Sequence, residues 1–208
     1  MATAVLAVQG AFAEHLARLR ELGEAAFELR QAADLSRPFD RLVLPGGEST
    51  VQAKLLRDLG LFGPLRERIE AGMPVLGTCA GLILLARATA DDRAGCGDLA
   101  GRDVEIALQR CAVEPFRTLD VTVRRNAYGR QLGSFHAEGA LEASADGAHI
   151  LPMTFIRAPR IERVGPNVKV LARVGDVPVA VQQANQLGVA FHPELDDDPT
   201  LHRMLLGL

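Results

Sequence analysis

The segment Gly77-Thr78-Cys79-Ala80-Gly81 gives the chain a candidate nucleophile. Apolar residues precede and follow it, so we expect a strand, a sharp turn at Cys79 and a helix that begins at Ala80. Glycines on both sides of the turn let neighbouring backbone pass closely, and the N-terminus of a helix favours a thiolate. The alternative is a buried structural cysteine, which is the commoner role of a lone cysteine.

His192-Pro193-Glu194 supplies a candidate base and a group to orient it. The segment follows the apolar residues 189–191, which predict a strand. Residues two apart on an extended chain point to the same side, and Pro193 favours an extended conformation at His192. A carboxylate beside an imidazole fixes its tautomer and stabilises the imidazolium. Alone, the pair is more typical of a solvated strand end, but together with Cys79 it predicts a Cys-His-Glu triad.

The segment Pro45-Gly46-Gly47-Glu48-Ser49-Thr50 follows a third apolar run, residues 41–44. Two adjacent glycines leave backbone N–H groups free to line a site at the carboxyl edge of a sheet. The segment lacks the Gly-Lys-Ser/Thr ending of a Walker A loop. The alternative is a plain turn before a helix capped by Ser49 or Thr50.

The remaining histidines are expected at the surface. They are His15, on the expected polar side of the first helix, His136, His149 and His202. No group of His, Cys, Asp and Glu has the spacing of a zinc site, so we expect no metal, and we expect no cofactor.

The elements that must position these residues follow from the apolar periodicity. In the first half, residues 4–8, 25–29, 41–44 and 74–77 predict strands, and helices are expected between them and after residue 81. This alternation predicts an α/β fold of three layers, with a mainly parallel central sheet and helices on both faces. In the second half, short strands are expected at residues 121–123, 154–156, 168–172, 177–181 and 189–191, followed by a helix over residues 201–208. We interpret these strands as an antiparallel extension of the same sheet.

The composition of the chain excludes several classes of protein. The chain has 208 residues, 48% of them hydrophobic, which is enough for a single domain over residues 1–208. Its net charge is −3, so it lacks the excess of basic residues that is typical of nucleic-acid-binding proteins. No apolar run approaches the roughly 18 residues of a membrane span, and the N-terminus lacks the basic start of a secretory signal. Three cysteines form no disulfide framework. A cytoplasmic location is therefore expected.

Taken together, the motifs resemble those of the class I, or triad, glutamine amidotransferases. Further segments narrow the resemblance to the glutaminase subunits of pyridoxal 5′-phosphate synthases. The segments that carry it are Val8-Gln9-Gly10 with Glu14-His15, and residues 44–50, 77–81, 125–131, 155–159 and 191–195. They span nearly the whole chain.

The resemblance implies that Cys79 attacks the side-chain amide of L-glutamine, that His192 transfers protons and that Glu194 orients His192. It implies an oxyanion hole made by the backbone N–H groups of Gly47 and Ala80. The residues implied to hold glutamine are Gly47, Glu48, Ser49, Arg125, Ile156 and Arg157. It also implies a partner, a TIM-barrel synthase subunit that receives the ammonia, in an assembly of twelve heterodimers.

Two features depart from the family pattern. Arg124 stands where an acidic residue is expected, and residues 89–116 are longer than the expected connection by roughly twenty residues. We expect this insertion, which holds Cys96 and Cys111, to be exposed. Two alternatives stay open: a glutaminase subunit for another acceptor, and a non-catalytic regulatory subunit.

Overall fold

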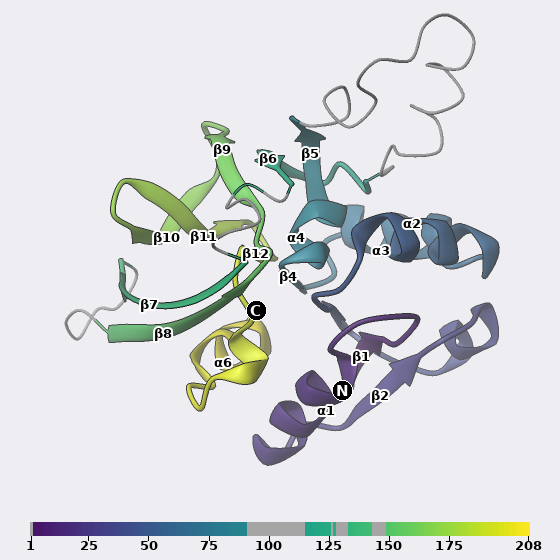
Figure 1. Cartoon of the computed structure of the whole chain (residues 1–208). Coiled ribbons are helices and arrows are strands. Elements are labelled where there is room, and N and C mark those ends of the chain that lie inside the picture. The colour runs from purple at the N-terminus through teal and green to yellow at the C-terminus, as the bar shows by residue number, and fades with distance from the viewer. Residues whose placement is uncertain (1, 91–114, 126, 128–132, 143–148) are drawn as a thin grey trace, which may run out of the picture.

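The computed structural model describes residues 2–90, 115–125, 127, 133–142 and 149–208, and Figure 1 shows their arrangement. The strands are β1 (Thr3–Leu6), β2 (Ala26–Leu29), β3 (Arg41–Leu44), β4 (Val75–Thr78), β5 (Ala86–Thr89), β6 (Leu119–Arg124), β7 (Ser134–Leu141), β8 (His149–Ile156), β9 (Arg160–Val164), β10 (Lys169–Val174), β11 (Val177–Gln183) and β12 (Gln186–Val189). The α-helices are α1 (Phe12–Glu21), α2 (Ser49–Asp58), α3 (Phe62–Glu70), α4 (Ala80–Leu85) and α6 (Thr200–Leu206), and two 3₁₀ helices are η1 (Ala32–Ser36) and η3 (Pro193–Leu195).

The main sheet has the strand order β2-β1-β3-β4-β12-β11-β10-β7-β8. Its pairings are parallel from β2 to β12 and antiparallel from β12 to β8. The parallel strands β1, β3 and β4 are short, largely apolar runs buried on both faces, as expected for strands covered by helices on each side. Helices α1 and α6 lie on one face of this part, and α2, α3 and α4 lie on the other (Figure 1). The predicted α/β class is confirmed, with a mixed sheet.

The second half differs from the expectation in one respect. Residues 121–123 do not extend the main sheet, because β6 pairs with β5 and β9 in a separate three-stranded sheet. Strands β5, β7 and β9 were not predicted, because charged or small residues interrupt the apolar alternation that marks a strand. Most of the predicted insertion at 89–116, with Cys96 and Cys111, lies outside the described residues.

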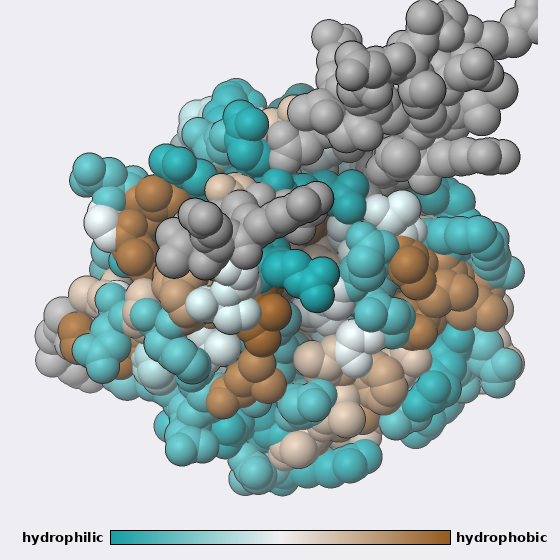
Figure 2. All heavy atoms as spheres, in the orientation of Figure 1, coloured by the Kyte–Doolittle hydropathy of each residue, from teal (hydrophilic) through white to brown (hydrophobic). Residues whose placement is uncertain are grey.

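The surface of the molecule on the face that Figure 2 shows is mostly polar. In Figure 2 hydrophilic side chains predominate, and apolar ones form separate patches. Large apolar side chains that are exposed include Val51, Ile150, Ile156 and Leu195. Within the described ranges, every helix is too short or too polar to cross a membrane.

The register of the parallel strands brings three chain segments to one edge of the sheet. Leu44 of β3 pairs with Gly77 of β4, and Val189 of β12 pairs with Thr78. The segments that leave β3, β4 and β12 at their carboxyl ends therefore emerge side by side, which is where ligands bind in open α/β sheets. These segments contain the three motifs predicted to carry the chemistry.

Candidate active site

Cys79 occupies a strained turn between β4 and α4. Its φ of 47° is positive, a conformation that non-glycine residues rarely adopt, and its side chain is buried. The Cys79 N–H donates a hydrogen bond of 2.9 Å to the carbonyl oxygen of Val189, which ties the turn to β12. The predicted strand, sharp turn and helix are confirmed, although α4 has only six residues.

The two flanking glycines are needed because the backbone is crowded. A Cβ atom on Gly81 would lie 1.9 Å from the carbonyl oxygen of Leu44, in β3. A Cβ atom on Gly77 would lie 2.7 Å from the Gly81 backbone. Both distances are well inside van der Waals contact, so only glycine allows α4 to begin this close to the sheet.

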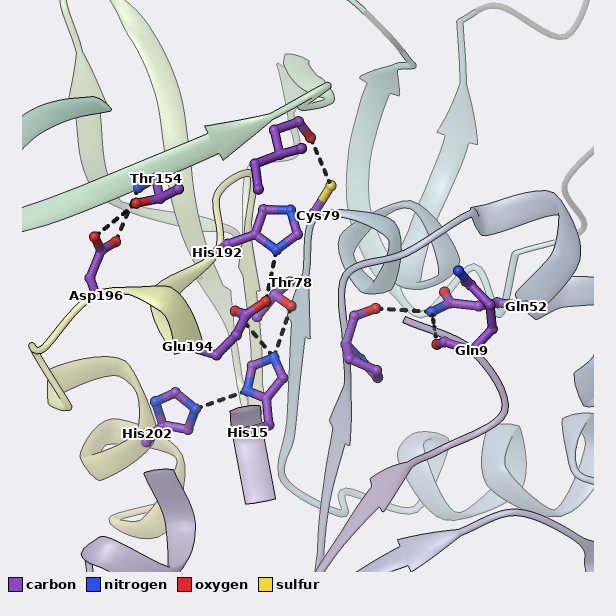
Figure 3. A network of polar contacts seen from close by, with 12 residues as sticks. Gln9, His15, Gln52, Thr78, Cys79, Thr154, His192, Glu194, Asp196 and His202 are labelled. Carbon is purple, nitrogen blue, oxygen red and sulfur yellow. Dashed lines mark hydrogen bonds and ion pairs between the residues drawn. The ribbon is translucent and has the colours of Figure 1, made fainter. Parts of the chain in front are cut away.

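His192 and Glu194 form a buried hydrogen-bonded pair (Figure 3). His192 Nδ1 lies 2.7 Å from Glu194 Oε1, and the Glu194 side chain is fully buried. The prediction that the pair lies on an extended segment is wrong: His192 comes just before η3, and Pro193 and Glu194 are part of that 3₁₀ helix. The helical turn brings the carboxylate back under the imidazole.

The electrostatics of this pair favour a protonated imidazole. Burial lowers the pKa of His192, but hydrogen bonds with Cys79 and Glu194, together with their charges, outweigh burial and raise the pKa to about 10. Burial raises the pKa of Glu194, but its neighbours His15 and His192, the latter also through a hydrogen bond, lower it overall. An imidazolium held between a carboxylate and a thiol stabilises the thiolate, which is the reactive form of cysteine.

The glycine-rich segment after β3 packs directly on the imidazole. A Cβ atom on Gly46 would lie 2.3 Å from Cε1 of His192, and one on Gly47 would lie 2.4 Å from Oε1 of Gln9. Gln9 Oε1 accepts a hydrogen bond of 2.8 Å from the Glu48 N–H. The cap of α2 is Glu48, whose carboxylate accepts from the Val51 N–H, and not Ser49 or Thr50 as the plain-turn alternative expected.

A cavity of about 320 Å³ opens between these segments. Eight of the predicted site residues line it, together with Gln9 and Ile83, which the sequence analysis did not place in the site. The eight are Gly47, Glu48, Ser49, Cys79, Arg125, Ile156, Arg157 and His192. The two other predicted residues lie behind this wall: Glu194 beneath His192, and the buried Ala80 directly after Cys79.

Arg125, which lines the cavity, contacts residues of the segment after β3. Its Nη2 atom lies 3.0 Å from Thr50 Oγ1 and 3.4 Å from Glu48 Oε1. The neighbouring Arg124, which replaces an expected acidic residue, donates from Nε to Glu162 Oε1 at 2.5 Å and does not line the cavity.

His15 and His202 are buried, which corrects the expectation that they lie at the surface. Both are fully inaccessible to solvent, whereas His136 and His149 are exposed as expected. His15 Nε2 lies 3.3 Å from Glu194 Oε2, and His15 Nδ1 lies 2.9 Å from His202 Nε2. The helical spacing carried a signal for His15, because it falls on the same face of α1 as Phe12, Leu16 and Leu19.

Comparison with known proteins identifies the class. Residues 5–206 match the SNO glutamine amidotransferase family, and the chain belongs to this family. A crystal structure titled as a glutamine amidotransferase superposes on it with a TM-score of 0.83, at 39% identity, over 100% of this chain and 98% of that one. The resemblance expected from the sequence is confirmed.

Two relatives define the chain more closely. It is 50% identical to the pyridoxal 5′-phosphate synthase subunit PdxT of Desulfitobacterium hafniense, over 99% of this chain and 92% of the relative. It is also 50% identical to the protein of the same name from Methanocorpusculum labreanum, over 100% of this chain and 97% of the relative.

Proposed function

We propose that this chain hydrolyses L-glutamine to L-glutamate and ammonia, and passes the ammonia to the synthase subunit of a pyridoxal 5′-phosphate synthase. The predicted enzyme class, a glutamine-hydrolysing subunit of that synthase, is confirmed by the family and by the PdxT relatives. The observation that carries the mechanism is the placement of Cys79 and His192 on one cavity wall, with Glu194 hydrogen-bonded behind His192.

The reaction has two halves. The Cys79 thiolate attacks the side-chain amide carbon of glutamine, and His192 gives its proton to the amide nitrogen, so the C–N bond breaks and ammonia leaves. A glutamyl thioester remains on Cys79. His192 then takes a proton from water, the hydroxide attacks the thioester carbon, and glutamate departs as Cys79 regains its thiolate. Glu194 holds His192 in the required tautomer throughout.

The residues around the cavity fit an amino acid substrate. The Arg125 guanidinium is suited to the α-carboxylate of glutamine, because its fork can pair both oxygens. We assign the negative oxygen of the tetrahedral intermediate to the backbone N–H groups of Gly47 and Ala80, each such donor being worth about 3 kcal/mol. The remaining residues proposed to hold the substrate are Gly47, Glu48, Ser49, Ile156 and Arg157.

The ammonia needs an acceptor outside this chain. We propose a TIM-barrel synthase subunit as the partner, in an assembly of twelve heterodimers located in the cytoplasm. The names of the PdxT relatives support a partnership with a synthase. Mixing the chain with its matching synthase and measuring the mass by light scattering tests the assembly: a particle of twelve pairs is expected, and a single pair would contradict it.

Glutamate release from the chain alone and with its synthase tests the activity. We expect a large increase on adding the synthase, and loss of that activity in Cys79→Ala. Synthesis of pyridoxal 5′-phosphate from added ammonium should persist in the same variant, because the synthase is intact. The matched control is His149→Gln, which replaces an exposed histidine outside the cavity and should keep wild-type activity.

Two outcomes would contradict the mechanism. Full activity in Cys79→Ala would exclude Cys79 as the nucleophile. If the wild-type chain releases no glutamate in the presence of a functional synthase, the non-catalytic alternative would be favoured. If glutamine hydrolysis occurs but a matched synthase forms no pyridoxal 5′-phosphate from it, another acceptor receives the ammonia.

A further inference from the structure

A series of buried polar side chains, each in contact with the next, extends from the proposed triad into the interior. From Glu194 it passes to His15 on α1 and then to His202 on α6 (Figure 3). His15 Nε2 faces two oxygens, Glu194 Oε2 at 3.3 Å and Thr78 Oγ1 at 3.2 Å. Thr78 directly precedes Cys79, so one imidazole contacts both the strand that carries the nucleophile and the carboxylate of the proposed triad.

The hydrogen-bonding capacities of the groups favour one placement of the protons. His15 Nε2 is hydrogen-bonded to Thr78 Oγ1, and Glu194 Oε2, 3.3 Å from the same nitrogen, has no hydrogen-bond partner among the described residues. Because an ionised Glu194 can only accept, a proton on His15 Nε2 is the arrangement that offers this buried oxygen a donor. In a neutral His15, Nδ1 then has a lone pair and accepts from His202 Nε2–H. His202 Nδ1, which has no hydrogen-bond partner among the described residues, is left as a bare lone pair in a buried site.

We propose that His15 is a positioning residue for the glutaminase reaction: as a neutral donor it holds the second carboxylate oxygen of Glu194, and His202 fixes its tautomer. The inference rests on the proposed triad, because it assigns Glu194 the task of orienting His192. The first oxygen of Glu194 holds the imidazole of His192, and a carboxylate held at one oxygen only would rotate.

Burial is the main reason that His15 stays neutral, because it is the largest cause that lowers the pKa of His15. Glu194 on η3 raises the pKa of His15, as does Glu14 on its own helix, while burial and the charge of His192 lower it, and burial is the largest of these causes. A second cation beside Glu194 would compete with the His192 imidazolium for the same carboxylate. A neutral imidazole supplies the hydrogen bond without the competing charge.

His202 is kept neutral in the same way. Burial is the main cause that lowers its pKa to about 3, and its neighbours His15 and Arg18 lower it further, while Glu194 raises it. A neutral His202 has one N–H, and donating it to His15 Nδ1 leaves the Nε2 proton of His15 for Glu194.

The test compares two variants of the full chain. His15→Leu removes the donor and keeps an apolar side chain of similar size, whereas His15→Gln keeps a neutral N–H at a similar reach. The first readout is the pH dependence of iodoacetamide alkylation at Cys79, followed on its own peptide so that Cys96 and Cys111 do not contribute. The second readout is kcat and KM for glutamine in the complex with the synthase.

In His15→Leu the midpoint of alkylation is expected to rise by about one pH unit, the size of one weakened hydrogen bond to a charged group. The kcat should fall about tenfold, which is the same free-energy change, and KM should change little. His15→Gln should restore most of both values. A purely structural role would lower thermal stability in both variants and leave the midpoint unchanged, and that result in folded protein would overturn the proposal.

A measurement on the wild-type chain does not depend on the variants folding. In protein labelled with ¹⁵N-histidine, His15 should appear as the neutral Nε2–H tautomer between about pH 6 and 8. A cation or the Nδ1–H tautomer would refute the assignment. Cys79→Ala separates the two proposals: if it abolishes activity while His15→Leu behaves as wild type, the triad stands and only the role of His15 falls.

Discussion

Gly81→Ala should damage both the stability and the activity of the chain, although alanine is the better helix former. Helix propensity alone favours alanine over glycine by about 1 kcal/mol. In this structure, however, the new methyl group would lie 1.9 Å from the Leu44 carbonyl oxygen and 2.9 Å from the Leu44 Cβ atom. Both atoms belong to a fully buried strand residue, so β3 and α4 must separate by roughly 1.5 Å to restore ordinary contact.

The steric overlap at Gly81→Ala should cost more free energy of folding than the higher helix propensity of alanine contributes. Overpacking of a rigid core costs about 1–3 kcal/mol and more where backbone must move. For a chain of this size about 2–4 °C of melting temperature corresponds to each kcal/mol, so we expect a decrease of roughly 3–10 °C. Because α4 begins next to Cys79, the same displacement moves the sulfur relative to His192, and a misplacement of about 1 Å costs on the order of 100-fold in rate.

The assays are calorimetric melting of the chain and glutamate release in the presence of the synthase. The matched control is Gly63→Ala in α3, where a Cβ atom would have no neighbour within 4 Å. This control should keep full activity and melt at the same or a slightly higher temperature. If Gly81→Ala melts within 1 °C of wild type and keeps its rate to within about twofold, the close approach of α4 and β3 does not matter, and the reasoning is refuted.

Three further predictions follow from the site and its surroundings. Arg125→Ala should raise KM for glutamine about 10- to 100-fold with a smaller effect on kcat, because a charge-assisted hydrogen bond contributes about 1.5–3 kcal/mol; an unchanged KM would remove Arg125 from the substrate site. His202 binds a proton more weakly in the folded chain, where its pKa is about 3, than in the unfolded chain, so its contribution to stability is present above about pH 6.5 and is lost as the pH falls toward 3. Urea unfolding at pH 7 and pH 5 should therefore show an acid loss of up to about 2 kcal/mol that is smaller in His202→Gln, and equal losses in both proteins would contradict it. Asp196→Ala should destabilise the chain by about 2–3 kcal/mol, because the carboxylate accepts from both the N–H of Thr154 at 3.1 Å and its hydroxyl at 2.8 Å; a melting curve that matches wild type would show that these bonds contribute nothing.

The sequence predicted the parallel half of the fold well because its strands are short, mostly apolar and separated by amphipathic helices. The boundaries of β3 are those expected, and Gly23, with a φ of 78°, follows α1 as expected. The antiparallel half was harder. In β7 and β9 charged residues stand among the apolar ones, and their pairing with partners distant in the chain decides their conformation.

For the candidate site, the residue types were predictable and the conformations were not. The contact between His192 and Glu194 was expected, but the reason given for it, an extended chain through Pro193, is wrong. Proline is as well suited to the start of a helical turn as to an extended segment, and local sequence does not choose between them. Gln9 was missed as a lining residue because its role depends on a hydrogen bond to Glu48, which is distant in the sequence.

The buried histidines show what the proposed site requires of the chain as a whole. Cys79 and His192 come from segments after β4 and β12, which lie together only because these distant strands pair in parallel. Behind them, α1 near the N-terminus brings His15 to the carboxylate of Glu194, and α6 near the C-terminus brings His202 to His15. Both helices lie on one face of the sheet, opposite α4 (Figure 1). The orientation of Glu194 therefore depends on both ends of the chain, and a change that loosens either α1 or α6 reaches His192 without touching the cavity wall.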